Sequence, residues 1–287
     1  MATIQVMDQT SIDLGPAFFA VLAALALLGA GVVGWARLGP GRAVLTASVR
    51  AAIQLAAVSA IIVLVLRSWW STLLFVVVMY LVAAGTSARR VTGGRTGWVT
   101  LLPIGLGVAP ALTLLVGTGA VPPTPLAVLP TAGILIGGAM TATSLAGRRA
   151  LDELRTRHGE YEAGLALGFT DRDAAMEVCR TSAGQALVPA LDQTRTVGLV
   201  TLPGAFVGVL LGGAGPVQAG ATQLLILVAL LAVEAVAIAG TVELVARHRL
   251  TAAPQPADSL PTRRRGFRPP TPRSHPPAGR RPDPPTR

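Results

Sequence analysis

The chain has 287 residues, of which 52% are apolar and 13% are charged, and its formal net charge is +10. Soluble domains carry about 25% charged residues, so this composition excludes an ordinary soluble domain and predicts a polytopic membrane protein. All 24 residues counted as lysine or arginine are arginine. A phosphate-binding P-loop needs a lysine, so the chain contains no such loop. The single cysteine, Cys179, excludes an internal disulfide and a cysteine cluster for zinc.

Seven apolar segments follow one another, each close to the ~20 residues that cross a bilayer as a helix. They are 16–36, 44–66, 69–88, 98–118, 125–147, 196–213 and 221–246. We therefore expect an all-α transmembrane domain over residues 1–251. Asp8 and Asp13 precede the first segment without any arginine, which favours a retained span over a cleaved signal peptide.

Arginines concentrate in alternate connections, which predicts the side of the membrane on which each connection lies. The arginine-rich connections are 37–43, 89–97 and 148–195, together with the residues that follow 246. The opposite connections hold only Arg67. We therefore predict an outside N-terminus, an inside C-terminus and a cytosolic loop over 148–187.

The loop 148–187 is the one long charged segment between apolar spans. Thr170 is placed to cap a helix, with Asp173 in the reciprocal position of a capping box. The following small and apolar residues share one helical face, and they are Ala174, Ala175, Val178 and Cys179. This pattern predicts a short amphipathic helix at the cytosolic surface.

Polar residues inside the spans are candidates for a substrate pathway, because a charge in hydrocarbon costs about 2.5–3.5 kcal/mol. Arg50 and Gln54 share a helix face, and Arg50 can alternatively reach the interface. Asp192 and Arg195 can pair at the cytosolic entry of the sixth segment, either as a gate or as an interfacial salt bridge.

The last span holds two further acidic candidates, Glu234 near its middle and Glu243 near its inner end. Glu234 has no basic residue within one helical turn, so we expect it to meet another helix, a cation or a proton. Glu243 can alternatively reach water. The spans contain no histidine and no cysteine, so Glu234 and Met140 are the candidates for a weak metal site.

Two features of the sixth segment concern helix geometry. Pro203 and Gly204 predict a hinge or a break, because proline removes a backbone hydrogen bond. Gly204, Gly208 and Gly212 at four-residue spacing predict a flat face for close helix packing.

Three stretches of the sequence resemble those of known membrane permeases. Glu162-Ala163-Gly164-x-x-x-Gly168 is similar to the E-A-A-x-x-x-G loop of ABC-transporter permeases, with Gly164 where that pattern has alanine. The stretch from Leu191 to Ala219 resembles FetB-type iron-export permeases, whose plant relatives include aluminium-sensitivity and STAR-type proteins. Arg50 to Leu55 matches another element of that family, so the resemblance covers about 42–249.

The resemblance implies a permease that exports iron across the cytoplasmic membrane of a bacterium and is not itself an enzyme. It implies a homodimer of permeases bound to separate cytosolic ABC ATPase subunits, which hold ATP and magnesium. It also implies that the loop residues couple the two subunits, namely Glu162, Ala163, Gly164, Gly168, Thr170 and Asp173. The residues themselves leave a polar organic solute, such as a nucleotide sugar, open as the substrate.

Two other classes remain open, a secondary transporter and a non-transporting membrane assembly protein. The first needs an internal inverted repeat, and none is clear between the two halves. Residues 252–287 contain eleven prolines and eight arginines, which predicts a disordered tail attracted to anionic lipid heads. Nucleic-acid binding is not expected, because no aromatic stacking set accompanies the charge.

Overall fold

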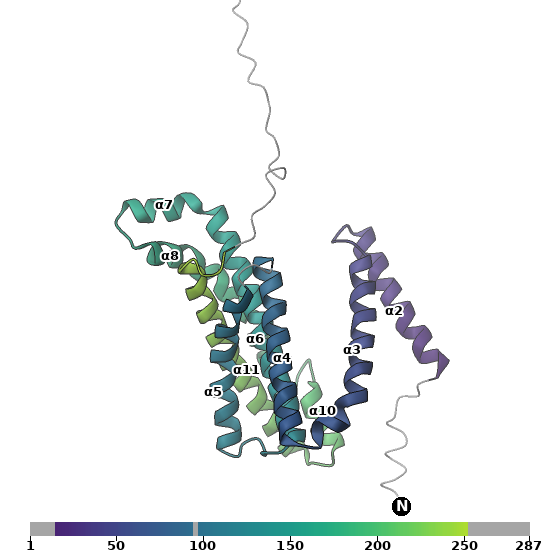
Figure 1. Ribbon diagram of the computed structural model, residues 1–287. Helices are drawn as coiled ribbons and strands as arrows, with labels where there is room; N and C mark the ends of the chain where they lie inside the picture. The colour runs from purple at the N-terminus through teal and green to yellow at the C-terminus, as the bar shows by residue number, and fades with distance from the viewer. Residues whose placement is uncertain (1–14, 94–96, 252–287) are drawn as a thin grey trace, which may run out of the picture. The chain divides into compact units, whose positions relative to one another are not determined.

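The computed structural model describes residues 15–93 and 97–251 as helices joined by short connections (Figure 1). The predictions for the tail 252–287 and for Asp8 and Asp13 lie outside these described residues. The helices are α2 (Pro16–Trp35), α3 (Arg42–Leu66), α4 (Trp69–Thr92), the 3-10 turn η1 (Gly97–Thr100), α5 (Leu101–Gly117), α6 (Pro125–Thr156), α7 (His158–Ala166), α8 (Asp171–Gly184), the 3-10 turn η2 (Gln185–Leu187), α9 (Val188–Thr196), α10 (Gly204–Leu211) and α11 (Pro216–Ala246). Within the described ranges the only β interaction is an isolated bridge between Val197 and Thr201, so the all-α prediction is confirmed.

Six helical segments in the described chain are long and apolar enough to cross a membrane: α2, α3, α4, η1 with α5, α6 and α11. Their bounds agree closely with the predicted spans, and three of them run further. Helix α11 begins at Pro216, five residues before the predicted start at 221. Helix α4 continues until Gly93 adopts a left-handed conformation with φ of 68°. Helix α6 continues to Thr156, about 48 Å in total, because no helix-breaking residue follows its apolar part.

The buried core surrounds α6, which packs against α4, α5, α8 and α11. Glycines allow the close approach of these helices. A Cβ on Gly107 of α5 would lie 2.7 Å from the carbonyl oxygen of Val233 on α11. A Cβ on Gly147 of α6 would lie 2.8 Å from Cγ1 of Val91 on α4.

Helices α2 and α3 form a hairpin that meets the rest of the domain at the turn between α3 and α4 (Figure 1). The Thr72 hydroxyl fixes this turn by donating to the Val65 carbonyl at 2.8 Å. No residue of α2 is buried, and Val65 is the one buried residue of α3. Most of this hairpin is therefore not covered by the described residues.

Helices α6 and α11 run parallel to each other. Gly138 lies beside Leu230 and Glu234, and nine residues later Gly147 lies beside Thr241. The end of α6 and the start of α11 are therefore on opposite sides of the domain. The chain between them has to return across its thickness.

The return is made by residues 188–211, which we call the broken return segment. The sixth predicted span, 196–213, is not a single helix, because α9 ends at Thr196 and α10 has only 8 residues. The interruption ends at Pro203 and Gly204, where the sequence predicts a hinge or a break. Gly198 has a positive φ of 81°, and Pro203 is extended with ψ of 154°. These two residues interrupt the helix where hydropathy alone predicts continuity. The sides on which the two ends of the chain lie stay a prediction.

Candidate translocation site and polar hairpin

The broken return segment carries an unwound stretch over residues 197–203. The amides of Leu199 and Val200 both donate to the Thr196 carbonyl, at 3.2 and 3.0 Å. The Gly198 amide donates to the Thr201 carbonyl at 2.8 Å. In lipid, such irregular backbone is tolerated only where protein covers it or where it lines a water-filled cavity.

Along the direction of the helices, the unwound stretch lies far from α7 and α8, beside the apolar part of α11. Val197, Leu202 and Phe206 line a hollow together with Leu227 of α11. Leu227 lies 19 residues before the end of α11 at Ala246, which corresponds to about 28 Å along the helix. The last turns of α9, which carry Asp192 and Arg195 and which we call the polar end of α9, therefore lie beside the apolar middle part of α11.

Asp192 and Arg195 of α9 form the expected ion pair, with 3.5 Å between Oδ1 and Nη1. Their side chains are 61% and 70% exposed. They lie in α9, just before the unwound stretch, and their predicted place at the cytosolic entry stays a prediction. Two exposed charges at this depth require water or another protein beside α9.

Gln223 of α11 anchors α10. Its side chain is 5% exposed, and its Oε1 accepts a hydrogen bond from the Phe206 amide at 3.2 Å. This bond satisfies one of the free amides in the first turn of α10. Gln223 is not among the residues predicted from the sequence, although a single amide inside the apolar segment 221–246 is a usable signal.

Glu234 is buried between α11 and α6. Its Oε1 would lie 2.8 Å from a Cβ on Gly138, so the glycine makes room for the carboxyl group. No hydrogen bond or ion pair to Glu234 is found among the described residues. No group of three or more histidine, cysteine, aspartate or glutamate residues is placed to hold a metal ion in that part of the chain. The predicted metal role of Glu234 and Met140 stays a prediction.

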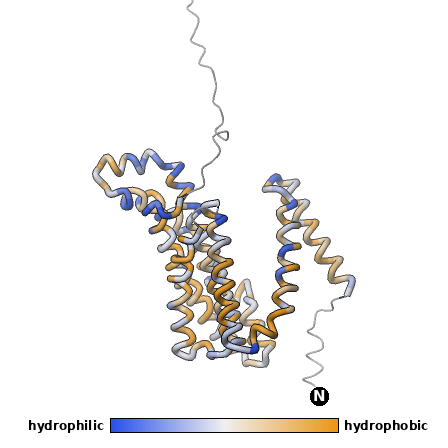
Figure 2. Tube along the Cα trace, in the orientation of Figure 1, coloured by the Kyte–Doolittle hydropathy of each residue, from blue (hydrophilic) through white to orange (hydrophobic). Residues whose placement is uncertain are grey.

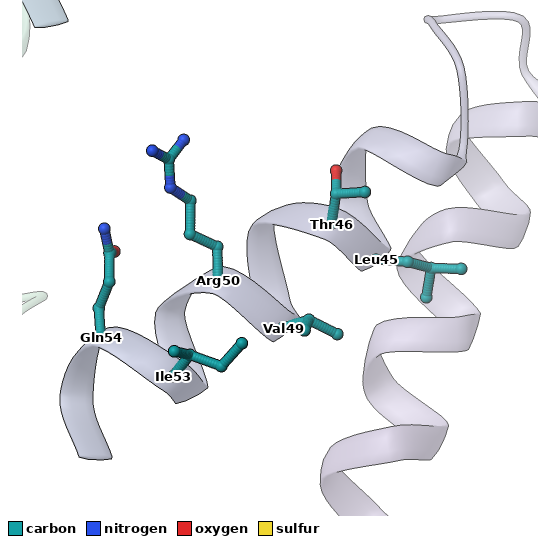
Figure 3. Close-up of a pocket in the computed structure, with 6 residues that line it drawn as sticks. All are labelled: Leu45, Thr46, Val49, Arg50, Ile53 and Gln54. Atoms are coloured by element: carbon teal, nitrogen blue, oxygen red, sulfur yellow. The ribbon is translucent and has the colours of Figure 1, made fainter. Parts of the chain in front are cut away.

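Arg50 and Gln54 project from the same side of α3, away from the adjacent helix (Figure 3). With Thr46, one turn earlier, they form what we call the polar stripe, which borders a shallow hollow on α3. Figure 2 shows hydrophilic positions interrupting the otherwise hydrophobic α3. The Arg50 guanidinium has no hydrogen-bond or ion-pair partner within residues 15–93 and 97–251.

Glu243 is engaged at the other end of α11. Its two carboxylate oxygens accept from Nε and Nη2 of Arg172 on α8, each at 2.7 Å, and Oε1 also accepts from Nε of Arg247 at 2.6 Å. This carboxylate raises the pKa of the Arg172 guanidinium above its ordinary value. These hydrogen bonds favour a structural role for Glu243, joining α8 to α11, over the pathway role predicted for it. The partner Arg172 is 71 residues away in sequence, so spacing could not reveal it.

Helices α7 and α8 form a polar hairpin at the end of α6 (Figures 1 and 2). Thr170 caps α8 as predicted, because its hydroxyl accepts from the Asp173 amide at 3.2 Å. Gly168 turns the chain between the helices with φ of 90°, a conformation that side chains rarely allow. Glu162 is exposed and lies 3.3 Å from Nε2 of His158.

Contacts near the turn of the hairpin join it to the residues after α11. Asp171 accepts a hydrogen bond from the Tyr161 hydroxyl, which raises the pKa of Tyr161. The other carboxylate oxygen of Asp171 lies 3.2 Å from Nε2 of His248. A groove runs between the two hairpin helices, lined by Arg157, Glu160, Ala163, Gly164, Leu167, Phe169, Ala174, Glu177 and Val178.

The buried face of α8 contains the residues predicted for it: Ala174, Ala175, Val178 and Cys179. Burial raises the pKa of the Cys179 thiol to about 11. At neutral pH we therefore expect N-ethylmaleimide to label Cys179 about a hundredfold more slowly in the folded protein than in the unfolded chain. Mass spectrometry of timed reactions measures both rates, and equal rates would show that α8 is not packed as described.

The fold and these sites define a polytopic helical membrane protein with an interrupted return segment and a polar hairpin after its longest helix. The chain belongs to the family described as "Uncharacterised protein family (UPF0014)", whose model matches residues 17–250. This family includes the FetB-type permeases that the sequence motifs resemble.

Three relatives illustrate the family. "UPF0014 membrane protein STAR2" of Oryza sativa subsp. japonica is 34% identical over 67% of this chain and 68% of its own length. "Protein ALUMINUM SENSITIVE 3" of Arabidopsis thaliana is 36% identical over 56% of this chain and 59% of its own length. "Probable iron export permease protein FetB" of Escherichia coli is 30% identical over 54% of this chain and 60% of its own length. No solved structure matches the chain.

Proposed function

We propose that the chain is the membrane subunit of an ATP-driven exporter in the cytoplasmic membrane of a bacterium. A separate cytosolic ATPase would hold ATP and magnesium and bind the polar hairpin. The observation that carries the proposal is this hairpin, because it combines an exposed groove with a rigid attachment to the two longest helices, α6 and α11. Membership of a family that includes a protein described as an iron export permease supports it.

Export of iron is the first substrate candidate, and it comes from that relative's name. The route would pass the unwound stretch and the polar end of α9, because these groups need water or protein beside them. A polar organic solute is the second candidate. The absence of a histidine, cysteine and carboxylate cluster from the described residues favours testing it in parallel.

Co-purification tests the class of protein. We expect an ABC ATPase to purify with the full chain from mild detergent, and we expect the hairpin variant Ala163→Arg to lose it. A secondary transporter or an assembly protein would show no such ATPase. Purification without any ATPase under several detergents would overturn the proposal.

Glu234→Gln tests the route. We expect the change to lower ATP-dependent accumulation of ferrous iron in inside-out vesicles about tenfold, since the amide keeps the shape of the carboxyl group and removes its charge. A tenfold change corresponds to about 1.4 kcal/mol.

Val236→Gln is the matched control, because it adds the same amide at an exposed position two residues further along α11. We expect this variant to transport normally. Normal transport by Glu234→Gln would remove Glu234 from the route. Equal loss in both variants would indicate a general effect of amides on α11.

A further inference from the structure

Three exposed features lack a partner in the described chain, although a membrane interior would penalise each of them. The first is the polar stripe of α3, where Arg50 is unpaired. The second is the polar end of α9, with Asp192 and Arg195 exposed. The third is the unwound stretch, whose side chains Leu199 and Val200 are 90% and 78% exposed.

The polar stripe and the polar end of α9 lie at the same depth. Arg50 is 16 residues before the end of α3, which corresponds to about 24 Å. Val197 borders the same hollow as Leu227, 11 residues after the start of α11, and Asp192 is five residues further from that end. Asp192 is therefore also about 24 Å from the face opposite the hairpin. The same count places Gln54 and Thr196 together at about 18 Å.

Charge and hydrogen-bonding capacity are complementary at this depth. Arg50 offers five unused N–H donors, and the exposed Asp192 carboxylate retains free acceptor positions beside its single contact with Arg195. An arginine and a carboxylate can form a bidentate pair. Such a pair would offset part of the cost of leaving Arg50 in hydrocarbon.

The surroundings favour protein rather than water as the cover. Leu199 and Val200 are apolar, whereas their irregular backbone cannot face lipid. Gly204 and Gly208 were expected to pack against a helix, yet a Cβ on either would meet no neighbouring atom within 4 Å in the described chain. The small residues Gly204 and Gly208 would let a helix of another protein chain approach this face closely, and that helix would also cover the irregular backbone.

We propose that the polar stripe of one copy of this chain packs against the broken return segment of a second copy, with Arg50 beside the partner copy's α9 at the level of Asp192. The two copies would make this contact twice, as a two-fold interface requires. The proposed contact rests on the proposed function only in that it would place part of the route between two copies. It does not depend on transport, because the contact can be measured without it.

Disulfide cross-linking tests the contact in native membranes. Cys179→Ala removes the only cysteine. One tagged full-length copy then carries Gln54→Cys, and a differently tagged copy carries Thr196→Cys. With copper phenanthroline and oxygen as oxidant, we expect a band at twice the monomer mass that contains both tags and disappears on reduction.

Ala52→Cys in place of Gln54→Cys is the matched control. Position 52 is also exposed and lies on the opposite side of α3, two residues away. We expect no band with it. No band with Gln54→Cys, or equal bands with both variants, would overturn the proposal, provided that both variants elute as folded protein on size-exclusion chromatography.

A charge exchange gives a second measurement. We expect Arg50→Asp to reduce the co-purification of two differently tagged copies at least fivefold, and Arg50→Asp with Asp192→Arg to restore it. Failure of the double variant to restore association, while both variants fold, would contradict the pairing. Association and cross-linking without any transport would leave the interface intact and reject the proposed function alone.

Discussion

Replacing Glu162 by Gln and Gly168 by Ala together should uncouple ATP hydrolysis from transport while the protein remains folded in the membrane. Gly168 has φ of 90°, where an alanine costs about 1–2 kcal/mol, so the turn between α7 and α8 would change shape. Glu162 presents an exposed charge on the adjacent helix. We expect transport by the complex with its ATPase to fall tenfold or more, on the order of 1.4 kcal/mol, while ATP hydrolysis continues.

The control for the hairpin is Gly159→Ala. Gly159 is also in α7, but its φ is not positive and a Cβ there would meet nothing within 4 Å. Transport and ATPase activity should both be unchanged in this variant. Unchanged transport in the double variant would remove Glu162 and Gly168 from the coupling surface, even if an ATPase is bound.

Gly107→Ala should destabilise the domain by about 1–3 kcal/mol, the usual cost of overpacking a close contact. The added Cβ would lie 2.7 Å from the Val233 carbonyl oxygen and 3.3 Å from Val233 Cγ1. The Val233 carbonyl belongs to the backbone of α11 and cannot rotate away from the added Cβ as a flexible side chain could. Helices α5 and α11 would therefore have to separate. Thermal denaturation in detergent, followed by the loss of the monodisperse size-exclusion peak, measures the effect.

Gly117→Ala, at the end of the same helix, provides the comparison. A Cβ there would meet nothing within 4 Å. Alanine favours helix over glycine by about 1 kcal/mol, so this change should be neutral or stabilising. Equal midpoints for the two variants would show that α5 and α11 are not in the close contact described.

The spans and the polar hairpin could be predicted because they depend on local patterns. Hydropathy located α2 to α6 and α11 to within a few residues at most ends, since lipid requires long apolar helices. The face of α8 followed from the spacing of Ala174, Ala175, Val178 and Cys179. The Thr170 cap followed from its position before Asp173.

The break at Pro203 and Gly204 was expected from the sequence. The rest of the broken return segment could not be predicted in detail, because residues 197–202 are as apolar as those of a continuous helix. Its bend depends on Gly198 in a positive φ and on the anchoring of Phe206 by Gln223, which are tertiary features. The same is true of Glu243, whose partner Arg172 is distant in sequence. Asp192 and Arg195 were paired correctly, whereas their place at the cytosolic entry stays a prediction.

The double hydrogen bond between Arg172 and Glu243 has a mechanical consequence. Helix α11 runs without interruption from Pro216 to Ala246, about 46 Å, and Gln223 near its other end holds α10. The hairpin and α10 are thus attached to opposite ends of one stiff rod. If α11 pivots near its middle, a displacement of the hairpin at one end would move α10 at the other end in the opposite direction.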